Sequence, residues 1–284
     1  MDLCNEKDIR ALLGRHGFRF SKSMGQNFLI EGWVPRDIAE ASGAGPDTGV
    51  LEIGPGIGPL TVQLARRAAK VAAIELDRTL YPILAETLAP YPNAEVVPGD
   101  AMKLDLAALV SDKFSGLTVI ACANLPYNIT TPVLTALIEA GCFASITVMI
   151  QREVALRICA APGSSDYGAF SVFCQYHTQP ELLFEVGPEC FLPAPKVTSA
   201  VIRLVPRSAP PQNLVDESFF FQVVRASFAQ RRKTLLNALA SGFSQFDKQT
   251  LADVIAACGF APTVRGETLD IPGFAAIANA LADR

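Results

Sequence analysis

Short apolar runs recur along the first half of the chain and alternate with segments of helical periodicity. The runs cover residues 49–53, 71–75, 94–97, 118–123 and 146–150. Runs of this length and β-branched content are typical of buried parallel strands. Behind the first run, apolar side chains recur on one helical face, and Pro59 suits the first position of that helix. The positions on that face are Leu60, Leu64, Ala65 and Ala68. The alternation predicts a doubly wound α/β sheet.

A proline-rich break separates this pattern from the C-terminal part of the chain. We expect the sheet to run to about Val205, and residues 206–213 (PRSAPPQN) have the composition of a linker. Beyond the linker the periodicity is helical only, for example over residues 219–228 and 233–243. A chain of 284 residues, 50% of them hydrophobic, is long enough for one full α/β domain and a smaller unit. We therefore expect an α/β domain over 1–207 and a small all-helical domain over 208–284.

The sequence lacks the motifs that are typical of several functional classes of protein. The seven cysteines include no C-x-x-C pair, which disfavours a zinc cluster or a disulfide framework. The two histidines, His16 and His177, lie outside hydrolase and metalloprotease motifs, so we expect them to be structural or at the surface. No run of about 18 apolar residues occurs, and the N-terminus is too charged to begin a signal peptide. These features predict a soluble, cytoplasmic protein without a metal site or a membrane partner.

The net charge of −4 hides a segregation of basic residues. Residues 10–30, 190–215 and 218–246 hold four, three and four basic residues, and no acidic residue. Such windows suit a surface that meets phosphate groups. Chance clustering of solvated lysines and arginines explains them equally well.

A glycine-rich turn closes the first strand, at EIGPGIG over residues 52–58. Gly54, Gly56 and Gly58 would let the backbone turn tightly and approach a ligand. Alone this is a weak signal, since dehydrogenases use similar turns. Glu75 ends the second strand, 21 residues after Gly54, where an acid can accept hydrogen bonds from both ribose hydroxyls. A nucleoside ligand is therefore expected.

Asp100 follows the third strand in the turn VPGD. Its carboxylate could accept from the adenine amine of a cofactor, or it could stabilise its own turn. Acids at the ends of consecutive strands lie along one edge of the sheet, where open α/β folds bind ligands. At this point NAD and S-adenosylmethionine both remain possible, although the G-x-G-x-G spacing departs from the dinucleotide pattern.

The fourth strand is followed by NLPY, residues 124–127. An aromatic amine is a poor nucleophile because its lone pair is delocalised into the ring. The side-chain oxygen of Asn124 and the carbonyl of Leu125 could each accept one N–H of such an amine and aim its lone pair at a methyl donor. Pro126 fixes the loop, and Tyr127 offers a face for an unstacked base. An ordinary turn after a strand is the alternative. The loop favours S-adenosylmethionine over NAD.

At this point the chain resembles the ribosomal RNA adenine dimethyltransferase family, and within it the bacterial branch that acts on 16S rRNA. The matching segments span nearly the whole chain. They are SKSMGQNFL at 21–29, EIGPGIG at 52–58, AIELD at 73–77, GDA at 99–101, NLPYN at 124–128, FLPAPKVTSAV at 191–201 and FAQRRKTL at 228–235.

The resemblance implies a Rossmann-like class I methyltransferase sheet, a helical C-terminal domain and S-adenosylmethionine as the cofactor. The positions that match the family's cofactor contacts are Asn27, Leu29, Gly54, Glu75, Asp100 and Asn124. We add Gly56 of the glycine turn to these cofactor-binding candidates. The resemblance assigns Phe28, Tyr127 and Phe191 to the target-base pocket. It places Lys196 near the RNA backbone, where a solvated loop lysine is the alternative. In the C-terminal domain, Arg231, Arg232 and Lys233 are expected to meet phosphates, contacts that position RNA without specifying its sequence.

The implied activity is dimethylation of the exocyclic amines of two adjacent adenosines near the 3′ end of 16S rRNA, during small-subunit biogenesis. We expect the enzyme to be a monomer. Two alternatives share many of these features, namely a large-subunit dimethyltransferase of the macrolide-resistance type and a non-catalytic RNA-binding assembly factor. An adenine DNA methyltransferase is disfavoured because its loop more often reads DPPY.

Overall fold

The computed structural model describes residues 1–18, 27–209, 213–282 and 284, and they form two compact units. Unit 1 comprises Met1–Ala155 and Glu181–Pro206, and unit 2 comprises Leu156–Pro180 and Arg207–Arg284. Unit 2 therefore takes a segment from the middle of the chain as well as the C-terminal helices. The division into 1–207 and 208–284 does not anticipate this segment. Residues 210–212 of the predicted linker and residues 21–26 of the first matching segment lie outside the described residues.

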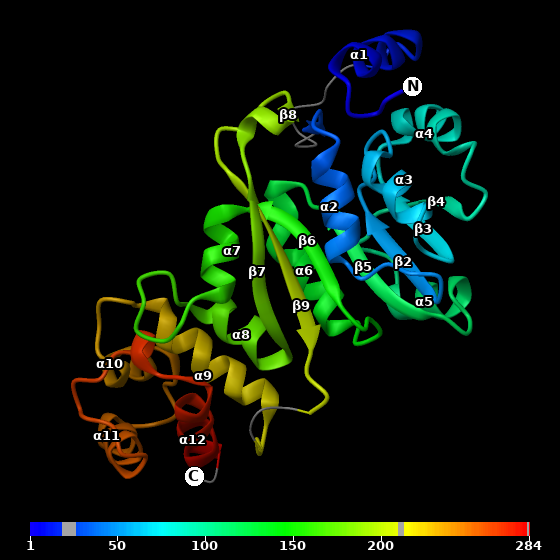
Figure 1. Cartoon of the computed structure of the whole chain (residues 1–284). Coiled ribbons are helices and arrows are strands. Elements are labelled where there is room, and N and C mark those ends of the chain that lie inside the picture. The colour runs from blue at the N-terminus through cyan, green and yellow to red at the C-terminus, as the bar shows by residue number, and fades with distance from the viewer. Residues whose placement is uncertain (19–26, 210–212, 283) are drawn as a thin grey trace. The chain divides into compact units, whose positions relative to one another are not determined.

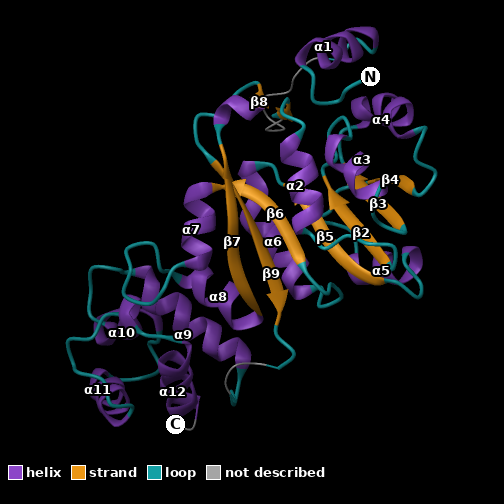
Figure 2. Cartoon of the chain, in the orientation of Figure 1, coloured by secondary structure: helices purple, strands orange, loops and turns teal. Residues whose placement is uncertain are grey.

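A seven-stranded sheet forms the centre of unit 1 (Figures 1 and 2), in the order β4-β3-β2-β5-β6-β9-β7. Its strands are β2 (Thr48–Ile53), β3 (Lys70–Glu75), β4 (Ala94–Pro98), β5 (Thr118–Asn124), β6 (Ile146–Gln151), β7 (Thr178–Val186) and β9 (Ser199–Pro206). The pairs from β4 through β6 are parallel, and β9 runs antiparallel to β6. The predicted strands lie within one residue of the observed ones, and the predicted Rossmann-like α/β fold is confirmed.

The prediction of a fully buried strand is wrong for β4. Four of its five residues are half-buried and the last is exposed, whereas β2 and β3 are buried along nearly their whole length. The reason is position, because β4 is an edge strand that pairs only with β3. An apolar run in the sequence does not distinguish an edge strand from a central one.

Helices join the strands of unit 1. They are α1 (Glu6–Arg15), α2 (Trp33–Ala41), α3 (Pro59–Ala65), α4 (Tyr81–Leu88), α5 (Leu106–Lys113), α6 (Thr130–Glu139) and α7 (Arg152–Cys159), the last of which continues into unit 2. As predicted, α3 begins at Pro59, directly behind Gly58. The helix ends at Ala65, so the predicted position Ala68 lies just beyond it, but all the predicted apolar positions from Leu60 to Ala68 are buried in one cluster with Val50 of β2 and Val71 of β3. Burial of this face fixes α3 on the sheet and so fixes where the glycine turn lies.

The strand order reverses between β2 and β5. From β2 the chain proceeds outward through β3 to β4, and it then returns to place β5 on the other side of β2. Loops leaving the carboxyl ends of β2 and β5 therefore diverge and open a crevice, which is where open α/β sheets bind ligands. The glycine turn and the NLPY loop are those two loops.

Unit 2 confirms the helical prediction for the C-terminal segment (Figure 2). Its helices are α8 (Ala169–His177), α9 (Glu217–Ala229), α10 (Leu235–Gly242), α11 (Lys248–Ala257) and α12 (Ile271–Ala282). The helices α9, α10 and α11 begin behind Asp216, Thr234 and Asp247, whose side chains each accept a backbone N–H of the first turn. Tyr167 and Val172 of the inserted segment are buried in the same core as these helices. This shared core explains why Leu156–Pro180 belongs to unit 2.

Candidate cofactor and active site

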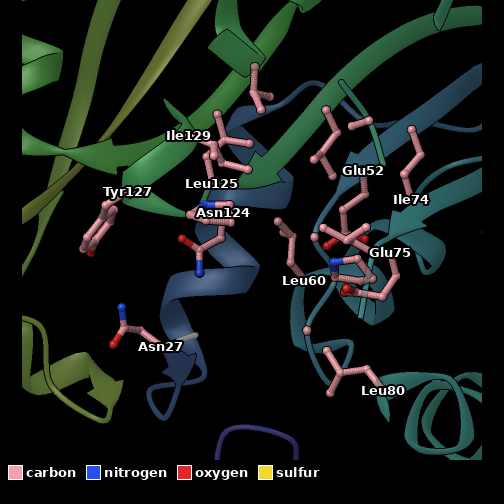
Figure 3. Close-up of a pocket in the computed structure, with 18 of the residues that line it drawn as sticks. Asn27, Glu52, Leu60, Ile74, Glu75, Leu80, Asn124, Leu125, Tyr127 and Ile129 are labelled. Atoms are coloured by element: carbon pink, nitrogen blue, oxygen red, sulfur yellow. The ribbon is translucent and has the colours of Figure 1, made fainter. Parts of the chain in front are cut away.

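One pocket, with a cavity volume of about 200 Å³, lies at the carboxyl ends of β2, β3, β4 and β5 in unit 1. Every residue predicted to bind the cofactor lines it: Asn27, Leu29, Gly54, Gly56, Glu75, Asp100 and Asn124. Leu125 and the three predicted aromatic residues, Phe28, Tyr127 and Phe191, line it as well. Figure 3 shows Asn27, Asn124 and Tyr127 toward one end of the pocket and Ile74 and Glu75 toward the other. Segments far apart in the sequence thus meet at the predicted edge of the sheet.

The glycine turn needs its glycines for two different reasons. Gly54, Gly56 and Gly58 all have positive φ values, of 70°, 61° and 95°, which disfavour any residue with a Cβ. Gly54 and Gly56 line the pocket, as expected for backbone that approaches a ligand. Gly58 does not line it. A Cβ there would come within 3.2 Å of the Thr87 hydroxyl and 3.3 Å of Leu88 on α4, so Gly58 serves helix packing and not the ligand.

Glu75 lies at the end of β3 with only 6% of its surface exposed. The backbone N–H of Asp77 donates to its Oε1 at 2.6 Å. Burial raises the pKa of Glu75 to about 6, and hydrogen bonds from nearby backbone N–H groups limit the rise. Near neutral pH the side chain is therefore an ionised acceptor in a mostly apolar pocket, which is the chemistry that binds a pair of ribose hydroxyls.

Asp100 takes part in its own turn as well as lining the pocket. The N–H of Met102 donates to Oδ1 at 3.0 Å, and the Lys103 ammonium lies 3.7 Å from Oδ2. These contacts are the local turn interaction that the sequence left open as an alternative. They fix the carboxylate at the rim of the pocket, so turn stabilisation and ligand binding are compatible for this residue.

The NLPY loop leaves β5 at the centre of the pocket (Figure 3). The N–H of Leu125 donates to the Met149 carbonyl on β6 at 3.1 Å, which fixes the peptide that follows Asn124. Within the described ranges, neither the Asn124 side-chain amide nor the Leu125 carbonyl has an intramolecular hydrogen-bond partner. Two consecutive residues that line the pocket therefore each offer an oxygen acceptor that has no donor among the described residues. Such a pair can receive both N–H groups of one primary amine.

Tyr127 is anchored to β9, which lies two strands from β5 in the sheet. Its hydroxyl lies 2.6 Å from Oγ of Ser199, a fully buried residue on β9. Burial raises the pKa of the Tyr127 hydroxyl, and the bond to Ser199 limits the rise. Because the ring is half-buried, one part of it stays accessible while the phenol end is fixed. This combination suits a stacking surface.

A two-residue ribbon brings the N-terminal motif to the pocket. Strand β1 (Phe28–Leu29) pairs antiparallel with β8 (Phe191–Leu192) and places Leu29 opposite Phe191. Phe28 and Phe191 are 5% and 3% exposed, respectively. Both rings line the wall of the pocket and expose too little surface for a base to stack on them. Of the three predicted aromatic residues, Tyr127 is therefore the best placed for stacking on a base.

Sequence reasoning gave no role to three further pocket residues. Glu52 is a buried acid at the end of strand β2, and the sequence shows it directly as a charged residue within an apolar run. Leu76 and Met102 line the pocket yet are 53% and 42% exposed. Large apolar side chains on a pocket rim suit a flat apolar ligand. The sequence signal for these two residues is their position, because Leu76 directly follows Glu75 and Met102 lies two residues after Asp100.

The predicted RNA-contacting residues lie outside this pocket. Lys196 is exposed, between β8 and β9 of unit 1. In unit 2, Arg231 uses its guanidinium internally, because Nη2 donates to the carbonyls of Ser165 and Tyr167 at 2.7 and 2.9 Å. Arg232 and Lys233 are exposed and have no ion pair within the described part of unit 2. All three side chains of the RRK run are exposed, but only Arg231 also donates to backbone carbonyls.

Several other basic residues of the acid-free windows are also paired. Arg10 pairs with Glu6, Arg15 with Glu86 and Arg203 with Glu181. Their acidic partners lie outside the windows in sequence and beside them in space. Arg19 and Lys22 lie outside the described residues. An acid-free stretch of sequence is therefore a poor measure of an unpaired basic surface in this chain.

None of the described helices has the length and apolar character needed to cross a membrane. No group of three or more His, Cys, Asp or Glu side chains in the described ranges is arranged to hold a metal ion.

The parallel sheet, its reversal at β2 and β5, and the acid-lined pocket at that point define a class I methyltransferase fold. Residues 17–259 match the family model described as ribosomal RNA adenine dimethylase. The chain belongs to that family.

Relatives of known name and structure agree with this assignment. The chain is 47% identical to the ribosomal RNA small subunit methyltransferase A of Geobacillus kaustophilus, over 99% of this chain and 97% of that protein. It is 44% identical to the protein of the same name from Alkaliphilus oremlandii, over 99% of each chain. A dimethyladenosine transferase from Plasmodium falciparum superposes with a TM-score of 0.72 at 26% identity, covering 88% of this chain and 95% of that one. The 23S rRNA methyltransferase ErmE superposes with a TM-score of 0.68 at 25% identity, covering 90% and 99%.

Proposed function

We propose that this enzyme uses S-adenosylmethionine to dimethylate adenine in small-subunit ribosomal RNA, at two adjacent adenosines near the 3′ end of 16S rRNA. The observation that carries the proposal is a pair of acceptors, Asn124 and the Leu125 carbonyl, that have no donor in the described part of the chain and lie at the end of β5 in a family of rRNA adenine dimethylases. The relatives named for the small subunit match over essentially their whole length.

The pocket fits S-adenosylmethionine on the chemistry of its own residues. Positive-φ glycines at 54 and 56 leave a backbone cradle that side chains would fill. Glu75 would accept from the ribose, Asp100 would meet the adenine, and the exposed apolar rim of Leu76 and Met102 would cover its faces. When bound, the cofactor supplies a methyl group activated by an adjacent sulfonium.

The protein's own contribution to transfer is orientation of the adenine amine. Asn124 Oδ1 and the Leu125 carbonyl would each accept one N–H, which draws the nitrogen from planar toward tetrahedral and frees its lone pair. The bond from Leu125 N–H to Met149 keeps the carbonyl in place. No residue is required to remove a proton before transfer, because the nitrogen becomes positively charged when its lone pair takes the methyl group, and it then loses a proton to solvent.

The target base must leave its stack to reach these acceptors. Tyr127, anchored through Ser199, would give the unstacked base a face, and stacking of this kind contributes about 1–3 kcal/mol per base. For the RNA backbone we propose Arg232 and Lys233 of unit 2 and Lys196 of unit 1, each exposed and without an ion pair among the described residues. For Arg231 we propose a mainly structural role, since its Nη2 donates to two backbone carbonyls although the side chain is exposed.

The large-subunit alternative is less well supported, because similarity to ErmE is 25% whereas the small-subunit relatives reach 47%. A non-catalytic assembly factor would have no need to retain Glu75, the glycine turn and both acceptors of the NLPY loop together. The deciding experiment is transfer of tritiated methyl groups to under-methylated small and large subunits in parallel, with the product nucleoside identified by mass spectrometry. We expect dimethyladenosine in the small-subunit RNA alone. Label confined to the large subunit, or no label, would refute the proposal.

A further inference from the structure

Thr130 holds the C-terminal end of the NLPY loop, and the proposed mechanism does not use it. It is the first residue of α6, is 2% exposed and does not line the pocket. Its hydroxyl lies 3.2 Å from the Pro126 carbonyl and 3.4 Å from the Tyr127 carbonyl, and it donates its proton to these two acceptors. Both carbonyls belong to the loop, so the buried hydroxyl ties the loop to the helix that follows it.

These bonds bear on the Leu125 carbonyl, which is one of the two proposed acceptors for the adenine amine. Its direction depends on where the peptides before and after it are held. The peptide before it is held by the bond from Leu125 N–H to the Met149 carbonyl, at 3.1 Å. The peptide after it carries the Pro126 carbonyl, which accepts from the Thr130 hydroxyl and from the N–H of Ile129, each at 3.2 Å. The Leu125 carbonyl thus lies between two anchored peptides.

The contribution of Thr130 differs from that of a helix cap. A capping side chain accepts a backbone N–H of the first turn, whereas the Thr130 hydroxyl donates to carbonyls. Ile129, which occupies the N-cap position of α6, makes no side-chain cap hydrogen bond. Without the hydroxyl, the Pro126 carbonyl would still accept from Ile129 N–H, so it would not be left buried without a donor. The hydroxyl therefore serves the direction of the loop more than the stability of the helix.

We propose that Thr130 is a positioning residue for methyl transfer, which acts through the Pro126 carbonyl to hold the main-chain acceptor of Leu125 in its orientation. A main-chain carbonyl cannot be deleted by substitution, and its direction is set by the backbone beside it. Pro126 contributes as well, because its ring fixes the φ angle between the two peptides, at −58°. The inference rests on the proposed mechanism, in which the Leu125 carbonyl accepts one N–H of the adenine amine.

Thr130→Val tests this, because it replaces the hydroxyl with a methyl group and keeps the branched shape. We expect the single-turnover rate of methyl transfer to small subunits, at saturating S-adenosylmethionine, to fall about tenfold to a hundredfold, since small misplacements of reacting groups cost this much. The dissociation constant of S-adenosylmethionine, measured by calorimetry, should stay within about threefold of the wild-type value. Thr130→Ser restores the donor and should recover the rate to within about threefold of the wild type. A merely structural residue would not give this split between rate and affinity.

Thr178→Val is the matched control. Thr178 is 1% exposed, and its hydroxyl donates to the Cys174 carbonyl, four residues back, at 2.7 Å. Thr130 and Pro126 have the same spacing, but Thr178 and Cys174 belong to unit 2 and do not line the pocket. Thr178→Val should lower the melting temperature at least as much as Thr130→Val does, and the transfer rate should stay within about twofold of the wild type.

The outcomes separate the inference from the function beneath it. If Thr130→Val transfers methyl groups at a near wild-type rate, the inference is overturned and the proposed function stands. It is also overturned if Thr130→Ser is as slow as Thr130→Val, or if Thr178→Val is equally slow. If the wild type itself transfers no methyl group to small subunits, function and inference fail together. Should Thr130→Val not fold, as judged by thermal unfolding, Thr130→Ala compared with Thr130→Ser decides in its place.

Discussion

Asn124→Ala separates a catalytic acceptor from a turn residue. Within the described ranges the Asn124 side chain makes no intramolecular hydrogen bond, and it is half-buried, so its truncation breaks no internal contact. The cost in folding stability should stay within about 1 kcal/mol. The proposed acceptor matters most as the amine becomes tetrahedral, and removal of one preorganised partner of this kind costs roughly 10²–10³ in rate, or about 2.7–4 kcal/mol. The loss of turnover should therefore greatly exceed the loss of stability.

Single-turnover methylation of small subunits at saturating S-adenosylmethionine measures that rate apart from any loss of cofactor affinity. Asn93→Ala is the matched control, because the Asn93 amide donates to the carbonyls of Ala65 and Ala68 far from the chemistry. It should lower the free energy of unfolding by about 1–3 kcal/mol and leave the transfer rate near that of the wild type. A near wild-type transfer rate in Asn124→Ala would reduce NLPY to a turn and refute the mechanism.

Three further predictions follow from the site and from unit 2. Glu75→Gln should weaken S-adenosylmethionine binding by about 1.5–3 kcal/mol per lost charge-assisted bond, and the wild-type affinity should fall as the pH drops through about 6 while the variant's does not, as calorimetry would show; equal pH profiles contradict the assignment. Arg232→Ser with Lys233→Ser should flatten the salt dependence of RNA binding by about 0.7–0.9 per phosphate contact, whereas Arg231→Ser should mainly lower the melting temperature of the protein; the reverse pattern would move the RNA face elsewhere. Ser199→Ala, which frees the phenol of the catalytic loop, should lower the transfer rate without changing cofactor affinity, and an unchanged rate would show that this bond does not position the loop.

Local patterns predicted most of unit 1. A central parallel strand is buried on both faces, so its apolar run is visible without knowledge of its neighbours, and β2, β3, β5 and β6 were predictable for this reason. The edge position of β4 was not, because it depends on which strand the chain leaves unpaired. The ribbon of β1 and β8 was also out of reach, since two residues per strand carry no periodicity and the partners lie far apart in the sequence.

The placement of Leu156–Pro180 shows a different limit. The segment begins within α7 and ends in the first residues of β7, so its boundaries fall inside regular elements and not at a linker. Tyr167 and Val172 are as apolar in pattern as any core residue of unit 1. A hydrophobic pattern says that a side chain is buried, and it does not say in which of two cores.

The same distinction explains why the pocket was more predictable than the RNA face. Every cofactor candidate follows a strand end, and the topology of a parallel sheet brings all strand ends to one edge, so sequence position implies spatial position there. A basic residue on a loop has no such constraint. Arg15 meets Glu86 and Arg231 meets the backbone at Ser165, in each case a partner more than 60 residues away. These long-range pairings decide which basic side chains remain available to bind phosphate. Arg232 and Lys233 directly follow Arg231, whose guanidinium is hydrogen-bonded to backbone carbonyls. The anchored Arg231 therefore holds the backbone of its two neighbours in place, while their own charges remain available for phosphate.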